Sequence, residues 1–232
     1  MTSLYALTSH ALPADALCGL DEYSPDCASI DRIARALEAS GCGEATTHRT
    51  AILRALGEHL RAQYTDAREA LRYLAGLDRR LAVWGACVCA REALRFVAEG
   101  EERPLRAIEA TERWLAGQAT LDDVQRAWAG ARAAWRGSAA DAAASSSAYA
   151  TVRAAAVAAT DYARADAADA AAYARAAAYA TADAAAYAAA CATATAARRS
   201  AAAWKAARNA ELRRLVGVIA DALPGLPPEV IA

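Results

Sequence analysis

Between residues 26 and 137, hydrophobic residues recur at steps of three and four, which is the spacing of one face of an α-helix. The first run follows Pro25 over residues 26–40, and the second covers residues 47–64 with Ile52, Leu56 and Leu60 in one stripe. Three further runs begin near residues 66, 78 and 103. No segment alternates with period two for long enough to indicate a strand, so the pattern predicts helices only.

The clearest amphipathic pattern covers residues 121–137. Its apolar positions follow alternating steps of three and four, and they are Leu121, Val124, Trp128, Ala131 and Trp135. Thr120 stands just before this run, and Asp123 follows three positions later. That spacing is typical of a capping box, in which each residue satisfies a backbone N–H of the other. The sequence therefore predicts a helix that begins directly after Thr120.

Glycine and proline indicate where the other helices begin and end. Pro104 lies in the first turn of the run that starts at residue 103, where a missing N–H costs nothing, and Gly117 marks the end of that run. Gly76 predicts a break or kink after residue 75, and Gly100 predicts the end of the helix that begins near residue 78. A last helix is predicted around residues 211–223, ending at Pro224.

The segment from Ser138 to Val216 contains neither glycine nor proline, and 41 of the 73 residues from Ser138 to Ala210 are alanine. Alanine has the highest helix propensity, so this segment is predicted to be helical. One helix over the whole segment would be about 120 Å long, too long for a domain of this size, and we expect breaks, above all at Ser145–Ser147. The expected fold is an all-α bundle of about eight to nine helices, with long Ala-rich helices in the C-terminal half.

We divide the sequence into three regions that are expected to form one compact unit. Residues 1–80 hold an irregular lead and about three helices, and residues 81–216 hold the helices that include the Ala-rich segment. Residues 217–232 are expected to form a C-terminal tail.

Charge and composition narrow the classes of partner. The formal net charge is −1, which provides no single-sign field to attract nucleic acid or an anionic membrane. No apolar run is long enough to span a bilayer, and aspartates interrupt any cationic face of the Ala-rich helices. The six cysteines do not repeat a spacing, and the first residues carry no cationic leader. We therefore expect a cytoplasmic protein with reduced thiols.

No motif predicts catalysis, a cofactor or a metal. Cys87 and Cys89 are two positions apart on a predicted helix and point about 200° away from each other, so they do not share one ion. The three histidines form no metal-binding spacing, and the chain has no glycine-rich phosphate loop. We expect no enzyme activity. The alternative is an enzyme whose site is assembled from carboxylates on separate helices that folding brings together.

Tyrosines punctuate the Ala-rich segment at Tyr162, Tyr173, Tyr179 and Tyr187. On a straight helix Tyr162, Tyr173 and Tyr187 fall within about 40° of one another, whereas Tyr179 is about 100° away. Two interpretations follow. The rings fill gaps between Ala-lined helices, which we favour, or they form a face that binds a protein partner.

The middle of the chain contains a distinctive block of short motifs. The block contains Trp84 and Cys87 before an Arg-Glu-Ala-Leu turn, then Arg103-Pro104, Ala107-Ile108-Glu109, Trp114 and Gly117. The segment Ala201–Arg208 matches at the far end. Over Leu81 to Arg208 the chain resembles a family of small, Ala-rich, all-helical proteins that are assigned as immunity proteins of bacterial polymorphic toxin systems, some of them in phage genomes.

The resemblance implies a protein that binds and neutralises a cognate toxin by occlusion, without chemistry of its own. The alternative is a phage or mobile-element accessory protein that inhibits a host system or serves as a structural component. Helix ends and core packing account for most of the shared residues. Glu109 is the exception, and we expect it to form a surface pair with Arg103, Arg106 or Arg113. A homodimer is left open.

Overall fold

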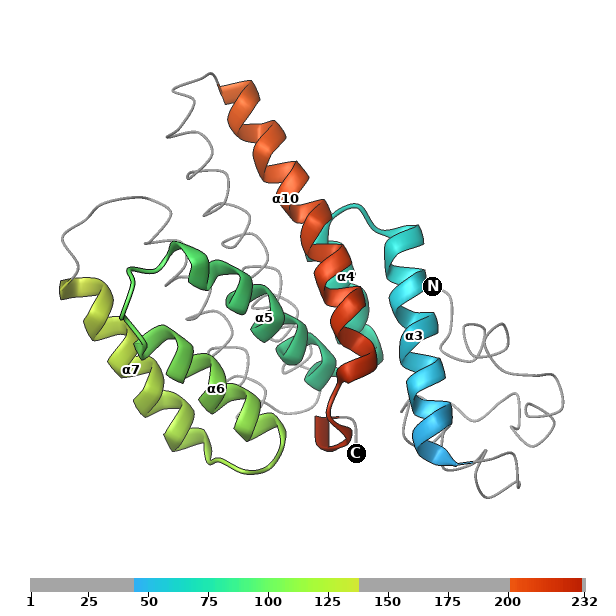
Figure 1. The fold of residues 1–232 in the computed structure, drawn as a ribbon, viewed down its shortest axis with the longest axis horizontal. Helices are drawn as coiled ribbons and strands as arrows, with labels where there is room; N and C mark the ends of the chain where they lie inside the picture. Colours follow the sequence, from blue (N-terminus) through green and yellow to red (C-terminus); the bar gives the residue numbers. More distant parts are fainter. Residues whose placement is uncertain (1–43, 138–200, 231–232) are drawn as a thin grey trace, which may run out of the picture.

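The computed structural model describes residues 44–137 and 201–230, and these residues fold into helices (Figure 1). No strand occurs among them, which confirms the all-α prediction. They hold six α-helices, whereas about eight to nine were expected for the whole chain. The α-helices are α3 (Ala45–Gln63), α4 (Ala67–Leu77), α5 (Arg79–Ala93), α6 (Arg103–Leu115), α7 (Leu121–Gly137) and α10 (Ala201–Ala222). The short 3-10 helices are η2 (Leu94–Phe96), η3 (Leu223–Gly225) and η4 (Pro228–Val230).

The boundary between α4 and α5 lies at Asp78, two residues after Gly76. Gly76 lies inside α4, and the chain turns two residues later at Asp78. Asp78 is extended, with φ −152°, and its carboxylate accepts a hydrogen bond of 2.7 Å from the Arg80 N–H. The same residue therefore follows the end of α4 and caps α5. The break predicted at Gly76 is therefore confirmed to within two residues, which is the usual uncertainty of a helix end.

One helix end differs from expectation. The helix that starts near residue 78 ends at Ala93 and continues as η2, well before Gly100, which has a left-handed φ of 81°. Helix α10 covers Ala201–Ala222, so residues 201–210 are helical, as predicted for the Ala-rich segment, and belong to the same helix as residues 211–222. The residues 201–210 are mostly alanine and favour helix whether or not they carry an apolar stripe.

The predicted capping box at the start of α7 is confirmed. The Thr120 N–H donates to Asp123 Oδ2 at 2.8 Å, and the Asp123 N–H donates to Thr120 Oγ1 at 3.2 Å. Of the predicted stripe, Val124 and Ala131 are buried, while Leu121 and Trp128 are half-buried. The sequence thus predicted both the start of this helix and the face that it buries.

The end of α6 is a Schellman motif centred on Gly117. This glycine has φ 71°, its N–H donates to the Trp114 carbonyl at 3.0 Å, and the Gln118 N–H donates to the Arg113 carbonyl at 2.8 Å. Arg80 adds a further hydrogen bond to the Leu115 carbonyl, so the end of α6 is tied to the start of α5. The turn that follows brings α7 back alongside α6.

Replacing Gly117 with alanine is expected to lower the free energy of unfolding by about 1–2 kcal/mol, because an added Cβ is strained in the left-handed region. No other atom lies within 4 Å of that Cβ, so the loss comes from backbone strain and not from a clash. Asparagine tolerates this conformation better, and Gly117→Asn is expected to cost less. Urea unfolding followed by circular dichroism measures both. Equal losses for the two variants would contradict the strain argument.

Helix α5 is central to the described part of the molecule (Figure 1). It packs against α6 on one side and against α4 and α10 on the other. Its residues Leu81–Cys87, Cys89 and Ala90 are buried, so nearly the whole circumference of the helix is covered. A helix that is apolar all round is stable in water only when neighbours surround it.

The two cysteines of α5 face different neighbours, as the helical geometry predicts. Cys87 packs with Ile108 of α6 and Ala131 of α7 in a small apolar cluster. Cys89 belongs to the main core, which contains residues of α3, α4, α5 and α10. Both thiols are free and fully buried, and burial raises the pKa of each. Both are therefore protonated near neutral pH and packed as small apolar groups.

The main core also joins the two ends of the described chain. Helix α3 packs chiefly against α10 and η3, with Ile52, Leu56 and Leu60 buried as predicted. The residues 217–232 were set apart as a tail, but α10 continues through Ala222. Beyond it, Leu223, Leu226 and Val230 are each at most 2% exposed. The segment from 217 to 230 is therefore part of the packed structure.

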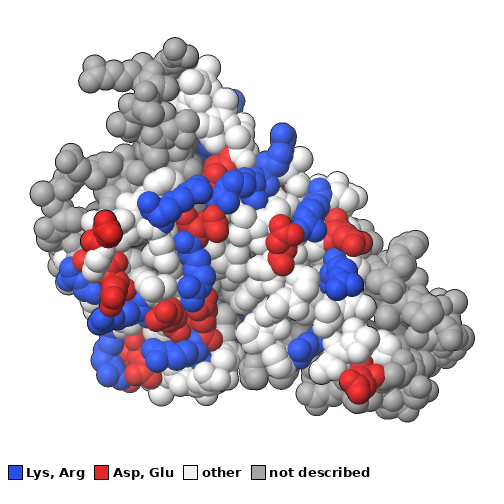
Figure 2. Space-filling model, viewed as in Figure 1, with Lys and Arg blue, Asp and Glu red and all other residues white. Residues whose placement is uncertain are grey.

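Charged side chains of both signs are interspersed on the surface in Figure 2. Several ion pairs join separate helices, among them Arg91 with Glu112 across α5 and α6, and Arg61 with Asp221 across α3 and α10. Arg214 of α10 binds Glu211 at 2.7 Å and Glu92 of α5 at 2.6 Å, and Arg95 also binds Glu211 at 2.7 Å. The network connects α10 to the central helix.

Candidate functional site

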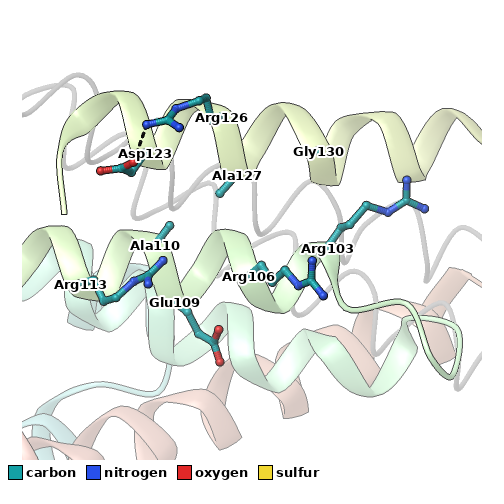
Figure 3. Close-up of a pocket in the computed structure, with 9 residues that line it drawn as sticks. All are labelled: Arg103, Arg106, Glu109, Ala110, Arg113, Asp123, Arg126, Ala127 and Gly130. Atoms are coloured by element: carbon teal, nitrogen blue, oxygen red, sulfur yellow. Dashed lines mark hydrogen bonds and ion pairs between the residues drawn. The ribbon is translucent and has the colours of Figure 1, made fainter. Parts of the chain in front are cut away.

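An open groove of about 510 Å³ runs between α6 and α7 (Figure 3). Its arginines come from both helices, and its floor is made of small residues. The lining residues are Arg103, Arg106, Glu109, Ala110, Arg113, Asp123, Arg126, Ala127 and Gly130. We call this surface the α6/α7 groove.

Three of the four arginines are held by carboxylates on nearby residues of the chain. Arg126 binds Asp123 at 2.6 Å and Arg106 binds Glu102 at 2.7 Å. Arg103 Nε binds Glu101 Oε1 at 2.7 Å. These arginine side chains are between 49% and 77% exposed, so solvent screens each ion pair and the arginines exchange partners easily.

Arg113 and Glu109 are four positions apart but do not form the expected pair. Within residues 44–137 and 201–230, neither of them makes a hydrogen bond or ion pair. The surface pair predicted between Glu109 and Arg103, Arg106 or Arg113 is therefore absent from these residues. Figure 3 shows the Glu109 side chain extending from α6 on the side away from α7.

The pKa of Arg91 on α5 is consistent with a Glu109 side chain that extends away from α7. Its hydrogen bonds to Glu112 raise the pKa of Arg91, and the charge of Glu109 contributes in the same sense. The charge of Glu109, a residue that lines the α6/α7 groove, thus also acts on the α5 side of α6.

The residues singled out by the sequence block divide into two groups. Trp84 and Cys87 are buried on α5, Pro104 is buried as the second residue of α6, and Trp114 packs half-buried against the main core. Gly117 forms the end of α6. Arg103 and Glu109 are exposed and line the α6/α7 groove. Packing or helix ends explain the first five, and the last two remain as candidate binding residues.

Sequence reasoning did not single out Arg126, and it named Arg106 and Arg113 only as partners of Glu109. The sequence does indicate three of the four groove arginines. Arg103, Arg106 and Arg113 are three and seven positions apart, so they lie on one helical face. The facing position of Arg126 depends on how α7 packs against α6, which the sequence pattern does not give.

The predicted partner-binding tyrosines Tyr162, Tyr173, Tyr179 and Tyr187 lie outside the described residues. Whether their rings face other helices or a partner stays a prediction. The described chain contains a different aromatic cluster, formed by His59 of α3, Tyr73 of α4 and Tyr64 between the two helices. The ring centroids of His59 and Tyr73 are 5.2 Å apart, and those of Tyr64 and Tyr73 are 5.6 Å apart.

Burial raises the pKa of Tyr73 to about 12, with a smaller contribution from Tyr64. In the unfolded chain the phenol ionises near pH 10, so between about pH 10 and pH 12 the unfolded state binds fewer protons than the folded state. The free energy of unfolding is therefore expected to fall as the pH rises through this window. Tyr73→Phe is expected to reduce that fall, as measured by urea unfolding at about pH 9 and about pH 11. An unchanged pH dependence in the variant would contradict the assignment to Tyr73.

Within the described ranges, no group of three or more His, Cys, Asp or Glu side chains is placed to hold a metal ion. None of the helices in these ranges is both long and apolar enough to cross a bilayer.

Comparisons with known proteins identify no relative. No family model, curated protein or solved structure matches the chain.

Proposed function

We propose that the chain is an immunity protein, which binds a cognate bacterial toxin and blocks it by occlusion, without catalysis and without a cofactor. In this proposal the partner is a protein, not nucleic acid or a membrane, and the complex forms in the cytoplasm. The proposal rests on the resemblance of the block from Trp84 to Gly117 to immunity proteins of polymorphic toxin systems.

The structural observation that supports the proposal most is the α6/α7 groove. Two α-helices form its walls, and four arginines with exposed side chains line it. Arginine is enriched at protein interfaces because its planar guanidinium donates several hydrogen bonds and also packs. A rigid support with exposed arginines suits a protein partner, because little backbone ordering accompanies binding.

The proposal is tested by affinity purification of the tagged full-length chain from the cells that produce it, followed by expression of each captured protein in a heterologous host. We expect one captured protein to stop growth when expressed alone, and growth to return when the chain is expressed with it. The reading frame of that toxin is expected beside the gene of the chain.

Other outcomes would overturn the proposal. A captured partner that is harmless, or whose toxicity the chain does not relieve, argues against an immunity role. Capture of a phage tail or capsid component would favour the accessory-protein alternative.

A further inference from the structure

The four arginines of the α6/α7 groove fall into two pairs by their position along it. Arg113 and Arg126 lie towards the end of α6 and the start of α7, where the two helices are joined (Figure 3). Arg103 and Arg106 lie on the first turn of α6, towards the other end of the groove. Seven positions separate Arg106 from Arg113, which is about 10 Å along a helix axis. From Arg103 to Arg113 the span is about 15 Å.

Carboxylates pair with three of the four arginines of the groove, and Arg113 has no such pair among the described residues. Asp123 is occupied by the Thr120 N–H and hydroxyl and by Arg126, and the Thr120 hydrogen bonds lower its pKa. Glu109 is directed away from α7, and Arg113 makes no ion pair with any described residue. A guanidinium has five N–H donors, so one carboxylate does not saturate it.

The floor between the two pairs carries Ala110, Ala127 and Gly130. These residues have little or no side chain, so a ligand that joins the two ends passes close to the helix backbones. No aromatic ring is among the described residues that line the groove, so these residues offer no platform on which nucleobases stack.

From this arrangement we infer that the α6/α7 groove binds an extended acidic segment of a protein partner. In an extended chain, carboxylates three residues apart are about 10 Å apart, which is the spacing of the two arginine pairs. A single phosphate reaches only one pair, whereas an acidic segment reaches both. This inference rests on the proposed protein-binding function and names the chemistry that its partner presents.

The test uses the full-length chain and a fluorescein-labelled peptide of about ten residues with aspartate at every third position, the others being serine and glycine. The comparison peptide has asparagine in place of aspartate. Fluorescence anisotropy at low salt is expected to show binding of the acidic peptide only. The double variant Arg106→Gln and Arg113→Gln is expected to weaken binding by about tenfold or more, because one arginine is lost from each pair.

The matched control carries Arg54→Gln and Arg213→Gln, which remove the same charge from exposed positions on α3 and α10. It is expected to bind the acidic peptide within about twofold of the unchanged chain. Circular dichroism verifies that both variants keep their helices. An equal loss in the control would show a general charge effect and overturn the site, as would equal binding of the two peptides.

Competition with the labelled acidic peptide tests two other ligands, inorganic phosphate and single-stranded nucleic acid. If inorganic phosphate displaces the acidic peptide at equal charge, the groove is a phosphate site. If a single-stranded oligonucleotide binds more tightly and depends on the same arginines, it is a nucleic-acid site. Either result overturns the inference. If the groove variant loses the peptide but still captures and neutralises a toxin, the immunity function stands and its main interface lies elsewhere.

Discussion

Replacing Gly57 with alanine is expected to lower the free energy of unfolding by about 1–3 kcal/mol, although alanine is the better helix former. Gly57 lies in α3 where that helix meets α10. A Cβ at this position would lie 2.7 Å from the carbonyl oxygen of Ala220 and 3.4 Å from its carbonyl carbon. Both atoms belong to the backbone of a helix and cannot turn aside as a side chain does. The two helices must therefore move apart, and the core beneath them loosens.

Gly217 provides the matched control. It lies inside α10, and nothing is within 4 Å of the Cβ that alanine would add. Gly217→Ala is therefore expected to stabilise the protein by about 0.5–1 kcal/mol through helix propensity alone. Denaturant unfolding followed by circular dichroism measures both variants. The same sign of change for the two substitutions would show that the close approach of α3 and α10 is not a constraint.

Replacing Leu215 with alanine is expected to cost about 2–5 kcal/mol, a large share of the stability of a typical domain. Leu215 is fully buried in the main core, which joins α10 to α3, α4 and α5. Removing most of its side chain loses apolar burial and leaves a cavity among helices that cannot close up freely. Because these helices share one core, we expect a single unfolding transition at a lower denaturant concentration.

Val218 lies three positions further along the same helix and is only half-buried. Val218→Ala is expected to cost less than half of the loss caused by Leu215→Ala, since less apolar surface is removed from the core. Unfolding is followed by circular dichroism and by tryptophan fluorescence. A second, separate transition in the Leu215 variant would contradict the single core.

The local pattern of the sequence predicted the helices themselves and many buried faces. The stripe of Ile52, Leu56 and Leu60 is buried as predicted, and Thr120 with Asp123 caps α7. These outcomes depend on contacts within a few residues, which a periodic pattern records. Gly76 marked the break between α4 and α5 to within two residues, because α4 ends at Leu77 and Asp78 caps α5.

Contacts between distant segments were beyond the sequence pattern. Nothing in the residues of α3 indicates that its apolar face packs against α10 and η3, because an apolar stripe specifies burial but not a partner. The α6/α7 groove was missed for the same reason. Arg103, Arg106 and Arg113 share a helical face that sequence alone reveals, but Arg126 joins them only when α7 folds back after Gly117.

The packing of α3 against α10 also determines when α3 can bury its apolar face during synthesis of the chain. Leu56 leaves the ribosome about 160 positions ahead of Leu215, one of the core residues of α10. At about 5–20 residues per second, the apolar face of α3 waits roughly 8–30 seconds for this partner. Translation speed across the intervening codons, and chaperones that shield apolar helices, therefore bear on the yield of folded protein.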